Sequence, residues 1–229
     1  EIGDKMNKII AKLAEANDLT IIKEADFNDD AKLGKGKEMV DRLTNLVAIF
    51  EGLDFGGNRA DGDDLLGDAY EYLMRHFATE SGKSKGQFYT PAEVSRIMAQ
   101  VIGVAAAKNA SQTIYDPTCG SGSLLLKAHD EAKTRTGHDL ALYGQEKDNA
   151  TTALAKMNMI LHGCTTAAPD IWNGNTLAVP HFKQANGQLK THDFVVANPP
   201  FSDKAWGNGL KPDDDEFHRF EFGVPPRKN

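Results

Sequence analysis

The sequence predicts an α/β domain with a parallel sheet over residues 81–229, preceded by an all-helical N-terminal domain over residues 1–80. In the first part, apolar side chains recur at three- and four-residue spacing, the period of one helix face. In the second, short continuous apolar runs alternate with helical patterns, which is typical of strands buried in a parallel sheet. These runs end in acidic, amide, glycine or proline residues. Since open α/β folds bind ligands at the carboxyl ends of their strands, we expect the functional residues at that edge.

The composition is that of an ordinary globular protein. The 229 residues are 40% hydrophobic, enough for a packed core, and the formal net charge is -7. A negative chain is poorly suited to bind nucleic acid by bulk electrostatics, so a polyanionic partner would be contacted through local patches or another subunit. The two cysteines, Cys119 and Cys164, lack zinc-type spacing, so we expect no disulfide framework, no metal and a cytoplasmic location. No signal peptide or transmembrane run is present.

Residues 1–80 contain three predicted amphipathic helices. Their apolar faces are formed by Met6, Ile9, Ile10 and Leu13, by Val40, Leu43, Val47 and Phe50, and by Leu65, Leu66, Ala69, Tyr70, Leu73 and Phe77. The links between them are rich in Asp, Asn and Gly, which favour turns, and the aspartates can cap the following helices. Lys83 and Lys85 in the next link are interpreted as part of a solvated hinge, with phosphate contact as the alternative.

The α/β domain opens with a predicted helix start at residues 86–93. Thr90 is placed as the N-cap, Pro91 as the first helical residue and Glu93 as the return partner of a capping box. The helix N-terminus offers free N–H groups to a carboxylate. Phe88 and Tyr89, just ahead of it, either wall a ligand pocket or pack in the core.

Thr113-Ile114-Tyr115 is predicted as the first strand, followed by a glycine-rich turn from Asp116 to Ser123 and a further helix. Gly120 and Gly122 allow the backbone to approach a ligand closely, and the helix N-terminus behind them favours a negative group. The spacing matches neither the dinucleotide fingerprint nor a P-loop. Asp116 places an acid where a cationic ligand would be stabilised, and a bare tight turn is the alternative.

Residues 140–144 are the next predicted strand, and Glu146 stands just beyond its tip. An acid about twenty residues after a glycine turn is placed to accept both hydroxyls of a ribose. Asp148 is positioned to cap a helix that ends at Gly163, whose methionines are interpreted as core residues. A further turn follows at residues 171–177, and the seven histidines are interpreted as surface or capping residues because they show no ligand spacing.

The last predicted strand, Phe194 to Ala197, is continuously apolar and must end at Asn198, because Pro199 cannot extend a ladder. Pro199 and Pro200 make the exit rigid, so the Asn198 side chain and the Pro199 carbonyl become fixed acceptors at the sheet edge. Two adjacent acceptors suit an amino group. The alternative is a strand that merely ends in a proline-rich loop.

Taken in order, residues 86–91, Asp116 to Gly122, Glu146 and Asn198-Pro199-Pro200-Phe201 resemble the motifs of adenine-N6 DNA methyltransferases. The helical domain ahead of them resembles that of the modification subunits of type I restriction-modification systems. The resemblance covers nearly the whole chain and implies a Rossmann-like S-adenosylmethionine-dependent methyltransferase fold. It also implies S-adenosyl-L-methionine as cofactor, and DNA, a specificity subunit and a restriction subunit as partners.

The resemblance also assigns roles to residues. The implied cofactor-binding residues are Gln87, Phe88, Tyr89, Thr90, Asp116, Thr118, Gly120, Ser121, Gly122, Glu146, Asn175 and Asn198. Residues 88–90 would hold the methionine end of the cofactor and Glu146 its ribose. Such families often have an acid where Asn175 stands, and Asp170 is the alternative for that contact. The implied catalytic residues, which would hold the flipped adenine, are Asn198, Pro199, Pro200 and Phe201.

Methyl transfer of this kind needs no metal or covalent intermediate. The sulfonium cofactor already carries its leaving group, so the protein must chiefly align the methyl group with the amine nitrogen and exclude water. Asn198 and Pro199 would stabilise the charge that develops on nitrogen, and Phe201 would stack on the base. The adenine must first swing out of the duplex.

The chain begins at Glu1 and has too few strands for a complete sheet, so we expect part of a longer protein, with residues 202–229 starting an active-site loop. The rival functions are methylation of a protein glutamine or an RNA base, and a non-catalytic scaffold that retains the fold. The large helical domain and Phe201 favour DNA, whereas Asn198 and Glu146 argue against a scaffold. Sequence recognition is assigned to the specificity subunit, because no DNA-reading motif is present.

Overall fold

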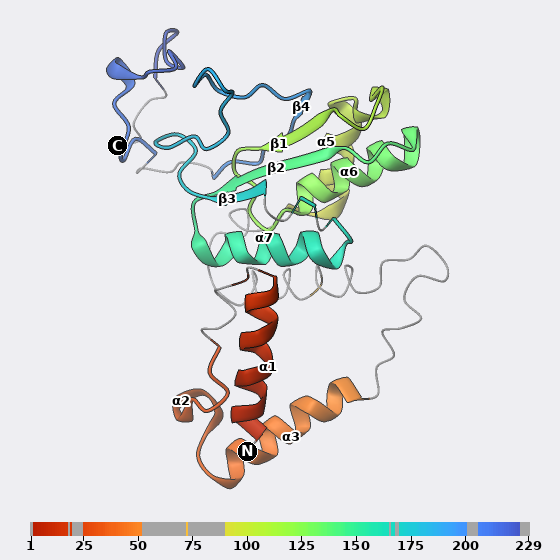
Figure 1. The fold of residues 1–229 in the computed structure, drawn as a ribbon, viewed down its shortest axis with the longest axis vertical. Coiled ribbons are helices and arrows are strands. Elements are labelled where there is room, and N and C mark those ends of the chain that lie inside the picture. The colour runs from red at the N-terminus through yellow and green to blue at the C-terminus, as the bar shows by residue number, and fades with distance from the viewer. Residues whose placement is uncertain are drawn as a thin grey trace. The chain divides into compact units, whose positions relative to one another are not determined.

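The structure is a computed structural model. It describes residues 2–17, 19, 25–51, 72, 90–164, 166–167, 170–200 and 206–224. The chain divides into two compact units, Glu1–Asp68 and Ala69–Asn229, both drawn in Figure 1. The domain boundary expected between residues 80 and 81 falls outside the described residues.

The first unit contains the described helices α1 (Ile2–Ala16), α2 (Asp30–Leu33) and α3 (Lys37–Glu51), and α3 contacts both others. The first two predicted amphipathic helices correspond to α1 and α3 and are confirmed. Asp29 caps α2 by accepting a hydrogen bond from the Ala31 N–H at 2.9 Å. Leu43 is buried, but Ile9 is 64% exposed, so the apolar faces are only partly covered by described residues. The third predicted helix lies outside the described residues apart from Tyr72, which is helical.

A parallel sheet forms the centre of the second unit. Its strands are β1 (Thr113–Asp116), β2 (Ala141–Glu146), β3 (Ile171–Asn173) and β4 (Phe194–Val195), in the order β3-β2-β1-β4. Each strand is parallel to its neighbours, and Tyr115 of β1 lies opposite Tyr143 of β2 and Val195 of β4. The parallel α/β sheet predicted from the sequence is therefore confirmed.

Two strands differ in detail from the prediction. Ile171–Asn173 is a strand rather than part of a turn; it is too short to show a period of its own and is defined by its pairing with β2. β4 ends at Val195 instead of Ala197, although the Val196 N–H still donates to the Tyr115 carbonyl at 3.0 Å. Val195 is 51% exposed, because it lies on the opposite face of the strand from buried Val196.

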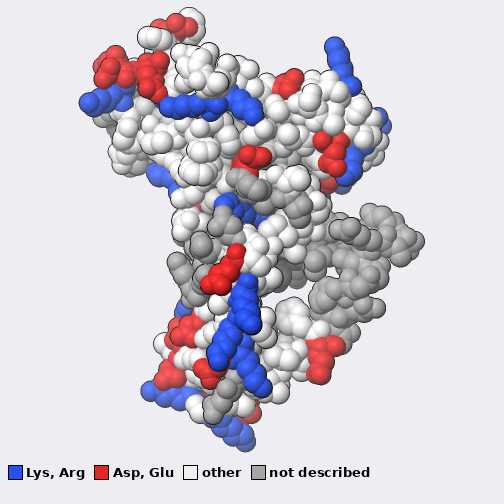
Figure 2. Space-filling model, in the orientation of Figure 1, with Lys and Arg blue, Asp and Glu red and all other residues white. Residues whose placement is uncertain are grey.

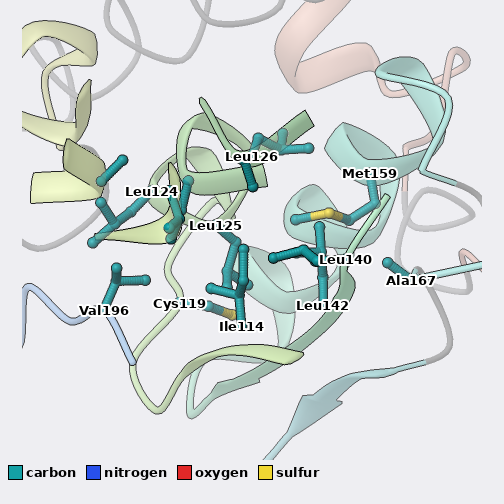
Figure 3. Close-up of a cluster of buried hydrophobic side chains, with 14 of the residues drawn as sticks. Ile114, Cys119, Leu124, Leu125, Leu126, Leu140, Leu142, Met159, Ala167 and Val196 are labelled. Atoms are coloured by element: carbon teal, nitrogen blue, oxygen red, sulfur yellow. The ribbon is translucent and has the colours of Figure 1, made fainter. Parts of the chain in front are cut away.

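The α-helices that the structure describes from residue 90 onward are α5 (Ala92–Val101), α6 (Ser123–Thr136) and α7 (Asn149–Leu161), with a 3-10 turn η2 (Val104–Ala106) between α5 and β1. Because α6 connects β1 to β2 and α7 connects β2 to β3, right-handed crossovers place both on one face of the sheet, as Figure 1 shows. The core lies between them and the strands (Figure 3). Leu125 and Leu126 of α6, Met159 of α7, and Ile114 and Leu142 of the sheet are at most 2% exposed.

The other face of the sheet carries aromatic residues. Phe182 contacts the rings of Tyr115 and Tyr143 at centroid distances of 5.7 and 5.2 Å, and His192 stacks on Tyr115 at 4.6 Å. Phe182 and His192 belong to the segment of residues 179–193 between β3 and β4. The buried Gln145 side chain of β2 makes two hydrogen bonds, at 2.9 and 3.1 Å, to main-chain groups of this segment. The chain between β3 and β4 is thereby fixed against the sheet.

The strand order reverses beside β1. From β1 the chain moves to β2 and β3 on one side, whereas β4 lies on the other side of β1. Open α/β sheets bind ligands at the carboxyl edge at such a switch point. Asp116 ends β1, and Asn198 follows β4. Both therefore lie at the edge where a ligand is expected.

Candidate functional site

The turn between β1 and α6 has a left-handed backbone at two of its glycines. Gly120 and Gly122 have φ angles of 54° and 80°, in the left-handed region that other residues adopt at a cost. A Cβ atom added to Gly122 would lie 2.6 Å from Met159 Cε, so the turn packs directly on α7. The Cys119 N–H donates to the Gln145 carbonyl at 3.0 Å, which fixes the turn to β2. The predicted glycine-rich turn is confirmed.

Asn158 of α7 supports this turn and is absent from the residues predicted from the sequence. Its side chain is fully buried, and its Nδ2 donates to the Ser121 carbonyl at 3.0 Å. Ser121 is itself 3% exposed and shares a 2.9 Å hydrogen bond between its hydroxyl and that of Ser123. The sequence feature that could have indicated Asn158 is a polar residue on the buried face of the helix, the face that also carries Ala155. Asn158 therefore holds the backbone of the turn in place.

Asp116, at the end of β1, is only 1% exposed. Its Oδ1 accepts hydrogen bonds from the Thr118 N–H at 2.8 Å and the Thr118 hydroxyl at 3.4 Å. Burial raises the pKa of Asp116 to about 7; repulsion from Glu146 acts in the same direction, and the Thr118 bonds oppose it. A cation bound beside this carboxyl group would favour its ionised form.

Glu146 is the last residue of β2, rather than lying beyond its tip as predicted. Its Oε2 accepts a hydrogen bond from the Gly120 N–H at 3.0 Å, and its Oε1 accepts one from the Asp148 N–H at 2.8 Å. Asp148 also caps α7, as predicted, by accepting from the Thr151 N–H at 2.9 Å. The carboxylate is thus fixed from two sides and joined to the glycine turn.

Asn175 lies in the turn after β3, near Glu146 in the fold. Its Oδ1 accepts from the Leu177 N–H at 3.0 Å, so the amide stabilises its own turn. The neighbouring Asn173 donates from Nδ2 to the Glu146 carbonyl at 3.1 Å. Asp170, the alternative to Asn175, precedes β3 and so lies toward the amino edge of the parallel sheet, away from Glu146.

Residues 206–224 are attached to this same turn. Arg219 donates from Nη2 to the Leu177 carbonyl at 2.8 Å and forms an ion pair with Asp215 at 2.6 Å. Thr176 in turn donates from Oγ1 to the Pro117 carbonyl at 2.6 Å. Residues 206–224 are therefore linked to the turn after β3, and that turn is linked to Pro117 at the end of β1. Local sequence patterns do not reveal these contacts, because the partners lie far apart in the chain.

Asn198 follows β4, and its side chain is held by Thr90. Asn198 Nδ2 donates to Thr90 Oγ1 at 3.1 Å, and Thr90 is 9% exposed. The prediction that Thr90 caps α5 is wrong: the helix begins at Ala92, with Pro91 in the cap position and no side-chain cap hydrogen bond. The physical reason is that the Thr90 hydroxyl is used by a residue 108 positions away.

The remaining predicted site residues are only partly described. Pro199 and Pro200 are exposed at the exit of β4, whereas residues 87–89 (Gln87, Phe88 and Tyr89) and Phe201 lie outside the described residues. The structure thus brings together Asp116 with Thr118, Gly120 with Glu146, and Thr90 with Asn198. Their roles toward a ligand stay predictions.

His129 does not fit the interpretation of the histidines as surface or capping residues. It is 3% exposed, its Nε2 contacts the Asp139 carboxylate, and its Nδ1 lies 3.9 Å from Cys164 Sγ. Burial alone lowers its pKa, but hydrogen bonds to Asp130, Cys164 and Asp139 raise the pKa of His129 to about 10. Asp139 precedes β2, so this pair belongs to the amino edge of the sheet rather than to the candidate site.

The described part of the chain shows neither a metal-binding cluster nor a membrane-spanning helix. No group of three or more His, Cys, Asp or Glu side chains there is arranged to hold a metal ion. None of the helices described is both long and apolar enough to span a membrane. Acidic and basic side chains are interspersed on the face shown in Figure 2.

The fold defines the class of protein. The structure resembles that of a type I restriction-modification system methyltransferase subunit from Streptococcus thermophilus, with a TM-score of 0.78 and 30% identity over 98% of this chain and 46% of that chain. A class I S-adenosylmethionine-dependent methyltransferase from Listeria monocytogenes, 16% identical, matches with a TM-score of 0.53 over 94% of this chain and 62% of that one, a likeness in fold alone. The chain has the α/β fold of methyltransferases.

Within that class, the chain belongs to the N-6 DNA Methylase family, whose profile matches residues 61–229. It is 30% identical over 192 residues to the type I restriction enzyme MjaVII methylase subunit of Methanocaldococcus jannaschii, covering 82% of this chain and 31% of the relative. It is 33% identical over 182 residues to the MpnII methylase subunit of Mycoplasma pneumoniae, and this match covers 77% of this chain and 33% of the relative. The chain therefore spans about a third of the length of these relatives. The resemblance read from the motifs is confirmed.

Proposed function

We propose that this chain is the catalytic part of the modification subunit of a type I restriction-modification complex, which transfers a methyl group from S-adenosyl-L-methionine to the N6 amine of adenine in DNA. The observation that carries the proposal is the arrangement at one sheet edge. Asp116 ends β1, Glu146 ends β2 and accepts a hydrogen bond from the Gly120 N–H, and Asn198 follows β4. Membership of the N-6 DNA Methylase family supports the reaction. Similarity to type I methylase subunits supports the assembly.

The cofactor would be held by residues at the ends of β1 and β2. S-adenosyl-L-methionine supplies an activated methyl group on a positively charged sulfonium, and Asp116 is an acid suited to stabilise that charge. Glu146 fits a ribose, because a carboxylate has about four acceptor sites and only two described N–H groups occupy it. The other proposed cofactor-binding residues are Gln87, Phe88, Tyr89, Thr90, Thr118, Gly120, Ser121, Gly122, Asn175 and Asn198.

The target adenine would be held at the exit of β4. Asn198 donates its amide N–H to Thr90, which leaves the amide oxygen for the adenine amine. The Asn198 oxygen and the Pro199 carbonyl would accept the two amine hydrogens and stabilise the positive charge that develops on nitrogen. Pro200 keeps this exit rigid, and Phe201 would stack on the flipped base.

The partners follow from the same proposal. Residues 1–80 would form an all-helical domain that contributes to a clamp around DNA, and residues 81–229 a Rossmann-like methyltransferase domain. A specificity subunit would read the DNA sequence, and a restriction subunit would join for cleavage. Methylation of this kind would take place in the cytoplasm, without a metal.

The test is transfer of tritiated methyl groups from S-adenosyl-L-methionine to unmethylated DNA by the full-length protein with its DNA-reading partner. Asn198→Ala should abolish transfer even at saturating cofactor, because Asn198 is assigned to the target amine. Asn186→Ala, at an exposed asparagine between β3 and β4, is the matched control and should transfer at the parental rate. Parental activity of Asn198→Ala would make the mechanism wrong.

Other outcomes would favour the alternatives. Label incorporated into RNA or a protein glutamine instead of DNA would change the substrate. Cofactor binding without any transfer, by the full-length protein with its partner, would favour a scaffold that retains the fold.

A further inference from the structure

We propose that Thr90 is a positioning residue for methyl transfer: its hydrogen bond with Asn198 Nδ2 holds the side-chain amide in place and leaves the amide oxygen for the target amine. This inference rests on the proposed function and moves Thr90 from the cofactor to the target side of the site. It concerns how the side-chain amide of Asn198 is held. The sequence motif Asn198-Pro199-Pro200-Phe201 does not show this by itself.

The hydrogen bond between Thr90 and Asn198 is shielded from water, and the Thr90 hydroxyl has no helix-capping role. Asn198 Nδ2 donates to Thr90 Oγ1 at 3.1 Å, and Thr90 is 9% exposed, so water competes little for this bond. The Thr90 hydroxyl caps no helix, because α5 has no side-chain cap. The Thr90 carbonyl accepts from the hydroxyl of fully buried Ser95 at 3.5 Å, which holds the backbone around the threonine.

Asparagine needs such a partner more than most acceptors. Its amide presents an oxygen acceptor and a nitrogen donor of nearly equal shape, and a half-turn about χ2 exchanges them. Only the oxygen can accept a hydrogen from an amine, while the nitrogen would repel it. The hydrogen bond from Nδ2 to Thr90 Oγ1 holds the amide in place before the base arrives and leaves the oxygen for the amine, which is preorganisation of the kind that lowers a transition-state barrier.

The competing role for Thr90 is direct contact with the cofactor. Loss of a cofactor contact weakens cofactor binding, whereas loss of amide orientation lowers the rate with cofactor bound. The two roles therefore separate in one pair of measurements: the cofactor dissociation constant, and the single-turnover rate at saturating cofactor and DNA.

The experiment uses the full-length protein with its DNA-reading partner. Thr90→Val keeps the shape of the side chain and removes the hydroxyl; it should lower the single-turnover rate about 2- to 12-fold, the range for one neutral hydrogen bond, with the cofactor dissociation constant unchanged. Thr90→Ser restores a hydroxyl and should recover most of the rate. Thr136→Val removes a hydroxyl at the end of α6, where it bonds to the Ala132 carbonyl, and should leave the rate unchanged.

Each result decides the matter. An unchanged rate in Thr90→Val, or a fall explained by weaker cofactor binding, overturns the inference, as does failure of Thr90→Ser to recover the rate. If Thr90→Val unfolds below the assay temperature, Thr90→Ala serves the same comparison. Absence of DNA methylation by the parental protein would instead remove the proposed function, and this inference with it.

Discussion

At Asp116, burial and hydrogen bonding act on the carboxyl group in opposite directions, and burial dominates. It raises the pKa from the ordinary value of 3.8 to about 7. Because the folded pKa is the higher one, the native state retains a proton that the unfolded chain has lost between about pH 4 and pH 7. The contribution of Asp116 to stability therefore falls as the pH rises through this window and is constant above it.

The same ionisation predicts pH-dependent cofactor binding. If the ionised carboxyl group stabilises the sulfonium cofactor, the dissociation constant should decrease about tenfold from pH 6 to pH 8, as the ionised fraction rises from about a tenth to about nine tenths. Calorimetry across this range, in buffers of different ionisation enthalpy, measures both the affinity and the released proton. Asp116→Asn should bind more weakly at pH 8 and lose most of the dependence; an equal dependence in that variant would assign it to another group.

Glu146 makes a separate prediction. Glu146→Gln keeps the shape of the side chain but replaces one acceptor oxygen with a donor, facing either the Gly120 N–H or the Asp148 N–H. Loss of charge-assisted hydrogen bonds should cost about 1.5–3 kcal/mol, or about 10- to 150-fold in cofactor affinity. Glu131→Gln, which breaks a helix-surface pair with Arg135, is the control. Equal affinity of the parental protein and Glu146→Gln would remove the ribose assignment.

At the scale of elements, α6 is bounded by two glycines with similar backbones and different surroundings. Gly122 precedes it with φ 80°, and Gly137 follows it with φ 73°. A Cβ atom at Gly122 would lie 2.6 Å from Met159 Cε, whereas a Cβ atom at Gly137 would meet nothing within 4 Å. The first glycine serves close packing of the site turn on α7, and the second only ends the helix.

This contrast predicts unequal costs of alanine substitution. Gly137→Ala should lower the free energy of unfolding by about 1–2 kcal/mol, the cost of a left-handed residue with a side chain. Gly122→Ala should lower it further, because the end of the buried Met159 side chain must also move aside in the packed core. Urea unfolding with a common m-value measures the difference. Equal losses would mean that Met159 moves aside freely and that the turn does not depend on close packing.

The elements also show what the sequence could predict. Period and composition located the parallel strands β1, β2 and β4, the glycine turn, and the Asp148 cap, because each is determined by residues within a few positions. β3 was missed because three residues carry no period and the strand depends on pairing with β2. The Thr90 cap was wrong because a partner 108 residues away uses the hydroxyl. Long-range hydrogen bonds decided the details that local patterns could not.

At the scale of the whole molecule, the net charge of the chain bears on how it would bind DNA. The net charge of the chain is -7, and acidic and basic groups are interspersed on the face shown in Figure 2. Phosphate contacts dominate the affinity of most DNA-binding proteins, and base contacts supply the specificity. We therefore expect a chain of this charge, whose sequence has no motif that reads base edges, to supply little of the affinity and little of the specificity.

The full-length subunit alone should therefore bind DNA weakly, with little sequence preference and with strong sensitivity to salt. Site-selective binding should appear only when the specificity subunit is added, because that partner would bring the base contacts. Gel shifts with matched site and non-site duplexes, at two salt concentrations and with or without the partner, measure affinity and selectivity together. A neutral-salt series should show the apparent affinity falling as the logarithm of the salt concentration rises. Tight, site-selective binding by the subunit alone would contradict this division of roles and favour a self-sufficient methyltransferase.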